Sequence, residues 1–299
     1  MMKIGLIDVD SKHANLALMK ISAYHKKIGD SVEWFDPLFS KCDIVYASKV
    51  FTFTKDYGYY PNGTIKGGTG FRDYTSTVPD ELICPDYSLY NLDYSMGFLT
   101  RGCPNHCEWC VVPEKEGNIR PAQDIEEFAR HRDVVLLDNN VLSSDFGIKQ
   151  IEKIARLKLK VDFNQGLDAR LIDKPMAKLL AKVKWLKPIR LASDNQAQKI
   201  PVERAVNNLR EAGATPSRYF CYLLVKDVAE AHDRSEHLRL INVDPFAQPY
   251  RDFRPKAKPP TRLQKGFARW VNHKANWKTE TWQHYKNRKH LKEHKNGNK

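Results

Sequence analysis

Three closely spaced cysteines are the residues of this chain best suited to chemistry. Cys103, Cys107 and Cys110 lie in the stretch TRGCPNHCEWC, residues 100–110, with the spacing C-x3-C-x2-C. Thiolates are soft ligands for zinc and for iron–sulfur clusters, and a C-x-x-C pair can also carry redox chemistry. The pattern therefore allows four interpretations: a zinc site, a dithiol redox site, an iron–sulfur ligand set, or three buried thiols.

The residues around the motif separate these interpretations. A structural zinc site needs a second ligand pair, but residues 111–255 contain no further C-x-x-C or H-x3-H pair, and His106 has no partner. A dithiol site would use Cys107 and Cys110 and leave Cys103 without a role. Three thiolates on three irons of a [4Fe–4S] cluster use the whole motif and leave one iron open to another ligand. The pattern favours the iron–sulfur interpretation.

The elements that must position this loop alternate regularly. We predict six strands that alternate with helices within residues 93–255, and the first strand, 95–100, leads directly into the cysteine loop. The predicted helices cover residues 122–131, 147–159, 174–186, 201–214 and 228–241. This order predicts a parallel sheet with right-handed crossovers, either open or closed into a partial barrel. In both cases chemistry belongs at the carboxyl ends of the strands.

Polar residues follow the predicted strands at that end. Asp138, Asn139 and Asn140 come after the second strand, Arg170 after the third, and Ser193 with Asp194 after the fourth. The carboxyl ends of parallel strands meet at one edge of a sheet, so these side chains should lie near the cysteine loop. Turn formation by the Asp-Asn-Asn run and solvation of the arginine are the competing interpretations.

The cysteine motif, with the aromatic Trp109 just before the last cysteine, resembles that of the radical S-adenosylmethionine superfamily. The resemblance extends over about residues 94–255, because the motif is followed by β/α units. It implies a partial (β/α)6 TIM-like barrel. It also implies that Cys103, Cys107 and Cys110 hold a [4Fe–4S] cluster whose open iron chelates S-adenosylmethionine.

The same resemblance implies an activity and further site residues. An electron from an external flavodoxin- or ferredoxin-like donor would cleave S-adenosylmethionine, and the resulting 5′-deoxyadenosyl radical would abstract hydrogen from a substrate that the sequence does not identify. Trp109 would lie near the adenine, or else be a core residue that fixes the loop. The remaining implied roles are methionine amino binding by Asp138, Asn139 and Asn140, ribose binding by Ser193 and Asp194, and carboxylate binding by Arg170. Asp-Asn-Asn departs from the family's frequent Gly-Gly-Glu.

Residues 1–92 predict a smaller Rossmann-like unit of strand, helix, strand and strand, with a linker. This domain resembles the N-terminal cobalamin-binding domain of one radical S-adenosylmethionine subgroup, whose motif is D-x-H-x-x-G. In the corresponding stretch here, DVDSKHANL, the spacing from Asp8 or Asp10 to His13 does not match this motif, and the motif's glycine is missing. We therefore predict a degenerate domain without cobalamin; the alternative is a cobalamin-dependent radical methyltransferase.

Residues 256–299 form a basic, Trp-containing and helical tail in this scheme. They carry 13 Lys and Arg against two Glu, so most of the net charge of +13 lies here. One interpretation is that the cations meet nucleic-acid phosphates and the aromatic residues stack on bases. The other is that Leu263, Phe267 and Trp270 dock a helix on the barrel and the charges face water.

The composition places further limits on function. Apolar residues make up 41% of the 299 residues, as in a globular protein, and no apolar run approaches the roughly 20 residues of a membrane span. The N-terminus lacks a long apolar signal segment, so we expect a cytoplasmic protein without membrane contact. The predicted function is a radical S-adenosylmethionine enzyme, with a nucleic acid or nucleotide-derived substrate slightly favoured. From another class, the alternative is a non-catalytic, metal-bearing, nucleic-acid-binding protein.

Overall fold

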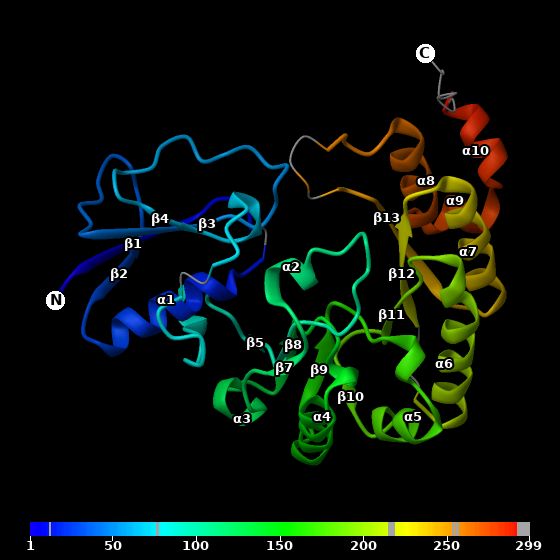
Figure 1. The fold of residues 1–299 in the computed structure, drawn as a ribbon, viewed down its shortest axis with the longest axis horizontal. Coiled ribbons are helices and arrows are strands. Elements are labelled where there is room, and N and C mark those ends of the chain that lie inside the picture. Colours follow the sequence, from blue (N-terminus) through cyan, green and yellow to red (C-terminus); the bar gives the residue numbers. More distant parts are fainter. Residues whose placement is uncertain (12, 76–77, 215–218, 253, 255–256, 292–299) are drawn as a thin grey trace.

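The chain has a mixed α/β fold in which parallel sheets lie in two regions (Figure 1). The structure is a computed structural model, and it describes residues 1–299 except 12, 76–77, 215–218, 253, 255–256 and 292–299. The predicted tail, 256–299, thus falls partly outside the described residues. One sheet lies on the left of Figure 1, and two more lie at its centre and right. Among the described residues, no helix is both long and apolar enough to cross a bilayer.

The first sheet belongs to the N-terminal region and is parallel throughout, in the order β2-β1-β3-β4. Its strands are β1 (Lys3–Asp8), β2 (Ser31–Trp34), β3 (Ile44–Ser48) and β4 (Ile65–Gly67). Helix α1 (Leu16–Lys27) packs Leu18 and Ile21 against this sheet. The Asn15 side chain caps α1 by accepting from Ala17 N and Leu18 N. The predicted strand, helix, strand and strand are all present.

The second region contains two parallel sheets and a short antiparallel pair. The second sheet, in the order β10-β9-β8-β5, contains β5 (Ser95–Gly97), β8 (Asp133–Leu136), β9 (Lys160–Phe163) and β10 (Lys184–Trp185). The third contains β11 (Arg190–Ala192), β12 (Phe220–Val225) and β13 (Asp244–Pro249), and β6 (Thr100–Arg101) pairs with β7 (Arg120–Pro121). A parallel bridge between Leu167 and Leu191 connects the second sheet to the third.

Helices between these strands cover the sheets, as the alternation predicts. They are α2 (Val112–Glu116), α3 (Ile125–Phe128), α4 (Asp145–Leu157), α5 (Lys174–Leu180), α6 (Lys199–Glu211) and α7 (Val228–Leu240). Helix α4 illustrates the cause. Ser144 caps its first turn, and Ile151 and Ile154 are fully buried on one face, as helical spacing requires.

Two predicted elements differ from those observed. The helix predicted over 174–186 ends at Leu180, and Lys184–Trp185 instead pair with β9 as strand β10. Burial of the Trp185 ring against Phe163, with ring centroids 5.7 Å apart, outweighs helix continuation there. The first predicted strand, 95–100, is interrupted between β5 and β6. Its interruption has a cause in the site described below.

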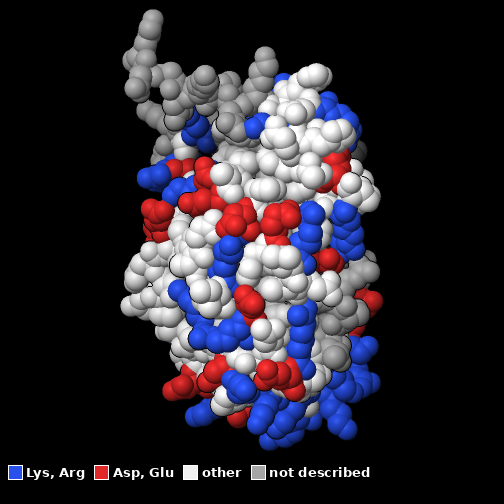
Figure 2. All heavy atoms as spheres, turned by 90° about the vertical axis from the view of Figure 1, so that its right-hand side faces the viewer, with Lys and Arg blue, Asp and Glu red and all other residues white. Residues whose placement is uncertain are grey.

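Three helices of the C-terminal region pack on the third sheet. They are α8 (Arg262–Asn272), α9 (Lys274–Thr279) and α10 (Trp282–Arg288), and α8 lies against β13. Phe267 and Trp270 are completely buried, while Leu263 packs at the edge of the same core. Their rings are therefore covered by protein and not free to stack on bases. Figure 2 shows basic side chains interspersed with acidic ones on the adjoining face.

Truncation of Trp270 tests whether these helices are part of the folded core. The indole is fully buried and its Nε1 donates to Glu280 O at 3.0 Å. We expect Trp270→Ala to lower the free energy of unfolding by about 3–5 kcal/mol, because it leaves a large cavity. Urea unfolding followed by circular dichroism measures the change. Leu240→Ala, at a side chain 84% exposed, is the control and should change it by less than about 0.5 kcal/mol. Equal stability of the two variants would contradict the packing.

Candidate functional site

The cysteine loop lies between β6 and α2, with both ends held together. Cys103 N donates to Gly117 O at 3.1 Å, and β6 pairs with β7 just beyond, so the loop closes on itself. Gly102 enters the loop with φ +79°, and a Cβ there would lie 2.2 Å from Asn118 O. Only glycine fits this close approach in this backbone conformation. The predicted loop is therefore a closed loop that follows the first strand of the second region.

The three thiols lie near one another, and two of them accept weak hydrogen bonds. Cys103 Sγ accepts from Asn105 N at 3.5 Å and from Asn140 Nδ2 at 3.6 Å, and Cys110 Sγ accepts from Val112 N at 3.4 Å. Burial raises the pKa values of Cys107 and Cys110, and the neighbouring thiols raise them further. Bound cations would reverse this by stabilising the thiolates.

A single zinc ion and a [4Fe–4S] cluster need different arrangements of their thiolate ligands. Among the residues that the structure describes, no group of three or more His, Cys, Asp or Glu side chains converges as a single metal ion requires. A zinc ion needs its thiolates within about 2.3 Å of one point. A [4Fe–4S] cluster instead binds each thiolate through a separate iron.

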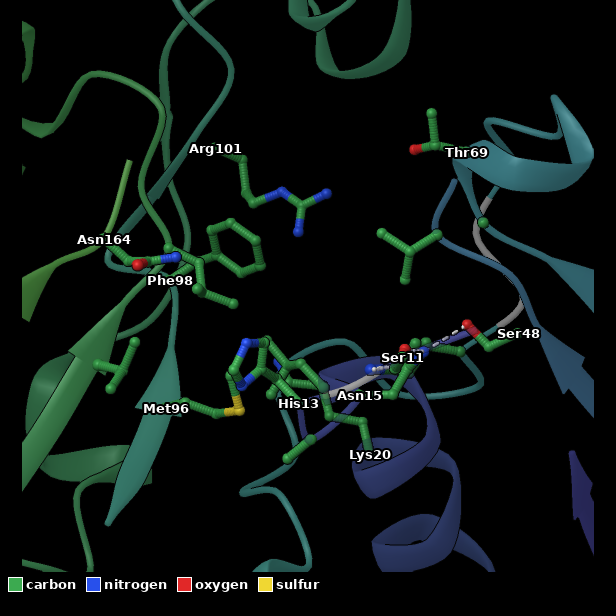
Figure 3. A pocket seen from close by; sticks show the side chains of 18 of the residues that line it. Ser11, His13, Asn15, Lys20, Ser48, Thr69, Met96, Phe98, Arg101 and Asn164 are labelled. Atoms are coloured by element: carbon green, nitrogen blue, oxygen red, sulfur yellow. Dashed lines mark hydrogen bonds between the residues drawn. The ribbon is translucent and has the colours of Figure 1, made fainter. Parts of the chain in front are cut away.

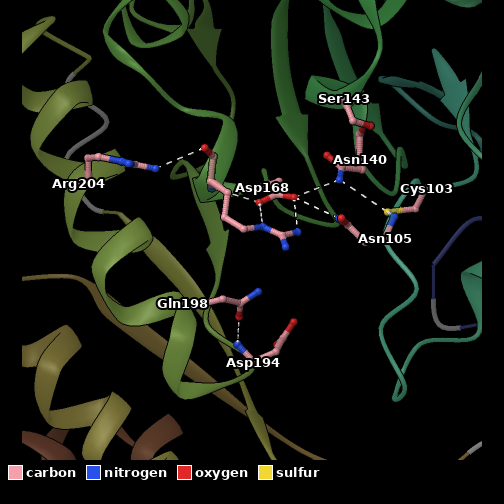
Figure 4. A network of polar contacts seen from close by, with 9 residues as sticks. Cys103, Asn105, Asn140, Ser143, Asp168, Asp194, Gln198 and Arg204 are labelled. Atoms are coloured by element: carbon pink, nitrogen blue, oxygen red, sulfur yellow. Dashed lines mark hydrogen bonds and ion pairs between the residues drawn. The ribbon is translucent and has the colours of Figure 1, made fainter.

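Asp168 is the centre of the polar network beside Cys103 (Figure 4). Its Oδ2 accepts from Asn105 at 3.3 Å and Asn140 at 3.2 Å, and Arg170 donates to both of its oxygens, at 2.8 and 2.6 Å. Burial alone would raise the pKa of Asp168, but the hydrogen bonds and charge of Arg170 hold it below its ordinary value. The carboxylate therefore stays charged and fixes the amides that face the cysteine loop.

This network changes the interpretation of Arg170. The sequence predicts that its guanidinium binds a cofactor or substrate carboxylate, and the structure pairs it with Asp168 of its own chain. Cofactor binding by Arg170 stays a prediction, and it must use the donors that face away from Asp168. Asp168 itself was not predicted. The sequence feature that could have indicated Asp168 is an aspartate two residues before an arginine, after the end of a predicted strand.

Asp138 interacts with the backbone that leads into the loop. Its carboxylate accepts from Leu99 N at 3.2 Å, Thr100 N at 2.6 Å and Thr100 Oγ1 at 2.7 Å. These bonds replace strand pairing and explain why the predicted strand 95–100 is interrupted. The predicted interaction of Asp138 with a methionine amino group is not tested; what the structure shows is that three donors of the chain already use this carboxylate.

Glu116 joins both ends of the loop and was not predicted. Its Oε2 accepts from Gly102 N at 3.0 Å and Asn139 Nδ2 at 2.9 Å. Arg101 Nε lies 3.0 Å from the same oxygen, an ion pair whose N–H is not aligned for a hydrogen bond. The Glu116 side chain is only 5% exposed. One buried carboxylate thus holds the start of the loop, its end and the residue after β8.

Among the described amides of this network, Asn140 is the one whose buried side-chain oxygen has no hydrogen-bond partner. Its Nδ2 donates towards Cys103 and Asp168, which orients the amide. Its Oδ1 is buried and has no hydrogen-bond partner in the described part of the chain. A buried acceptor without a donor is costly, so a bound donor such as an ammonium group would stabilise it. Asn140 thus lies beside Cys103, and its binding of a methionine amino group stays a prediction.

Ser193 and Asp194 lie across the loop from Asn140, with Trp109 beside them. The Trp109 indole approaches the Asp194 carboxyl, whose pKa burial raises to about 6 while Arg234 and Trp109 oppose the rise. Ser193 is almost fully buried, and its carbonyl accepts from Arg234. Arg234, a buried cation of α7 that was not predicted, therefore supports the carboxyl end of β11.

A surface ion pair also spans the loop and the third sheet. Glu108 and Lys226 meet at 2.6 Å, which connects the cysteine loop to the residue after β12. Together with the Trp109–Asp194 contact, it places the loop over the carboxyl ends of β11 and β12. The structure thus brings the sequence-predicted residues of both sheets around one loop.

Comparison with known proteins adds little at this level of similarity. No protein-family model matches the sequence, and no curated protein matches it. A solved structure that resembles the chain is the crystal structure of Streptococcus suis SuiB bound to S-adenosylmethionine, at 14% identity and a TM-score of 0.43. The match covers 62% of this chain and 48% of SuiB, so the chain spans about half the length of that protein. A superposition of this quality shows neither a shared family nor a shared function.

The pH dependence of stability tests the buried Asp138 carboxylate. Burial raises its pKa to about 6 from its ordinary value of 3.8. Because the folded-state value is the higher one, the folded chain binds this proton more tightly. The stability it contributes is complete below about pH 4 and is lost as the pH rises through 6. At about 1.4 kcal/mol per pKa unit, the loss is about 3 kcal/mol.

Asp138→Asn removes this titration. We expect the difference in unfolding free energy between wild type and Asp138→Asn to shift in favour of the variant as the pH rises from 4 to 7. Urea unfolding at several pH values measures it. Asp93→Asn, at an exposed carboxylate, should follow the wild-type profile. Parallel profiles for wild type and Asp138→Asn would show that the Asp138 pKa is not raised.

Proposed function

We propose that this chain is a radical S-adenosylmethionine enzyme with an N-terminal Rossmann-like domain that does not bind cobalamin. The observation that carries the proposal is the unused, buried Asn140 Oδ1 beside Cys103, one of three thiols on a loop over the ends of parallel strands. An amino group and three soft ligands are what S-adenosylmethionine and a three-cysteine [4Fe–4S] cluster require of such a site.

The residues present fit both groups. Cys103, Cys107 and Cys110 would hold the cluster, and Asn140 Oδ1 would accept from the methionine ammonium. Bound there, the reduced cluster would supply the electron that cleaves S-adenosylmethionine to methionine and a 5′-deoxyadenosyl radical, which then abstracts a substrate hydrogen.

The chain itself contributes orientation and exclusion of water. Asp168 holds the amides of Asn105 and Asn140 towards the loop, and Glu116 fixes the loop ends, so the thiols need little rearrangement on loading. Trp109 and the buried Asp194 cover the opposite side, where Asp194 could accept from ribose hydroxyls. A radical species needs such a closed and rigid surrounding to avoid side reactions.

Loss of one cluster cysteine tests the proposed chemistry. After anaerobic reconstitution with iron and sulfide and reduction with dithionite, wild type should form 5′-deoxyadenosine from S-adenosylmethionine. We expect Cys107→Ala to abolish this product, because an iron loses its thiolate. Product is quantified by chromatography. Cys42→Ala, at a partly buried thiol of the first sheet region, should retain it. Cleavage by Cys107→Ala, or a colourless wild-type protein with one tightly bound zinc, contradicts the proposal.

The Asn140 acceptor gives a separate prediction. Asn140→Ala should keep the cluster absorption but weaken S-adenosylmethionine binding about ten- to a hundredfold, since a hydrogen bond to a charged group contributes about 1.5–3 kcal/mol. Equilibrium dialysis of the reconstituted protein measures the affinity. Asn118→Ala, at an exposed residue after the loop, is the matched control and should bind normally. Unchanged affinity in Asn140→Ala would remove Asn140 from the site.

A further inference from the structure

A large cavity separates the N-terminal sheet from the second sheet. Its volume is about 930 Å³, which is within the size range of small-molecule sites. Figure 3 shows the first turn of α1 and the end of β3 on one side and β5 on the other. The cavity continues to Arg101, directly before the cysteine loop, and to Lys115 directly after it. It therefore adjoins the proposed site.

The wall on the side of the second sheet has an apolar part, and Asp133, Asp162 and Asn164 of that sheet region also line the cavity. Met96, Phe98, Val135 and Leu137, from β5, β8 and the residues after them, line it, and Ala17 of α1 faces them. The alternation of strand residues explains this, since Val134 and Leu136 point the other way into the helix-covered core. An unfilled apolar wall of this kind accommodates the hydrocarbon or ring portion of a ligand.

Arg101 extends into the cavity from above this wall (Figure 3). Its guanidinium carbon lies 4.1 Å from the Phe98 ring centroid, and its Nε lies beside Glu116. These two contacts fix the guanidinium plane and use one of its nitrogens. The two terminal nitrogens have no hydrogen-bond partner among the residues that the structure describes. They are pre-oriented donors for an anion.

Lys115 is the second cation near the cysteine loop that lines the cavity. No acceptor of the described chain bonds its Nζ, and burial, with the nearby Arg101 charge, lowers its pKa. Other cavity cations differ in this respect: Lys20 donates to Gln123 at 2.8 Å, and Arg190 pairs with Asp162 at 2.7 Å. Glu116 lies near both cations and offsets one of their two charges, so a bound anion would offset the other.

We propose that this cavity binds the substrate, a small molecule with an apolar body and an anionic group, either carboxylate or phosphate, held by Arg101 and Lys115. This inference rests on the proposed function in one respect: the ligand is called a substrate because the adjoining site is proposed to be catalytic. The apolar body would lie against Met96 and Val135, and the anion would lie next to the cysteine loop. A cavity between two sheets suits a small molecule better than a nucleic-acid strand; the preference for a nucleic acid or nucleotide-derived substrate stays a prediction.

Two fluorescent probes of similar shape test this directly. Anilinonaphthalene sulfonate has an apolar body and an anion, whereas N-phenylnaphthylamine has nearly the same body without the anion. We expect Lys115→Gln to weaken the sulfonate about tenfold, as the loss of one charge-assisted bond predicts, and to leave the neutral probe unchanged. Lys187→Gln, at an exposed cation of the opposite end of the same cavity, is the matched control and should change neither. Equal effects of the two lysine variants would overturn the proposal.

Two further measurements locate the probe and identify the anion. Val135→Trp fills the cavity and should weaken both probes; unchanged binding of both would overturn the assignment. Phenyl phosphate or benzoate should displace the sulfonate probe, whereas benzyl alcohol, which has no anion, should not. The anion that competes more tightly identifies the anionic group of the ligand. If neither anion displaces the probe, the proposal is overturned. None of these measurements needs the cluster. If S-adenosylmethionine is cleaved but probe binding does not depend on Lys115, only this inference is rejected. If probe binding depends on Lys115 but S-adenosylmethionine is not cleaved, only the proposed function is rejected.

Discussion

The chain enters the cysteine loop through a fully buried segment, and this constraint governs the site. Leu99 and Thr100 are completely shielded from water, so their N–H groups need acceptors inside the protein. Strand β5 ends at Gly97, before both residues, and Thr100 begins β6, which pairs with β7. The Asp138 carboxylate accepts from both, and so fixes the end of β8 to the start of the loop. The loop direction, and with it the cysteines, follows from that interaction.

Buried carboxylates repeat this arrangement around the loop with different partners. Glu116 accepts from Gly102 and Asn139, and Asp168 accepts from Asn105 and Asn140. Each has a cation beside it, Arg101 for Glu116 and Arg170 for Asp168, which offsets the cost of burial. Charge is therefore balanced within the site. In the adjoining cavity, Lys115 Nζ and the terminal nitrogens of Arg101 have no hydrogen-bond partner among the described residues.

The C-terminal helices are part of the folded core, which their basic composition does not indicate. Phe267, Trp270 and Trp282 form a cluster of rings 5.1–5.7 Å apart that covers the third sheet. Burial of such rings contributes more to stability than exposed charges on the same helices. Nucleic-acid contact by the remaining cations stays a prediction, and it would have to proceed without these aromatic side chains.

The sequence by itself determined the order of elements and the position of the cysteine loop. Apolar periodicity and turn residues are local signals, so the alternating strands and helices, and polar residues after strands, could be predicted from them. Only the tertiary structure decided which side chains share a hydrogen bond. Asp168, Glu116 and Arg234 act on residues far away in sequence, and no spacing rule reveals such partners. For the same reason helix 174–186 was overestimated, since pairing of Lys184–Trp185 with β9 is a non-local contact. The cavity, too, exists only because two separately predicted sheets face each other across α1.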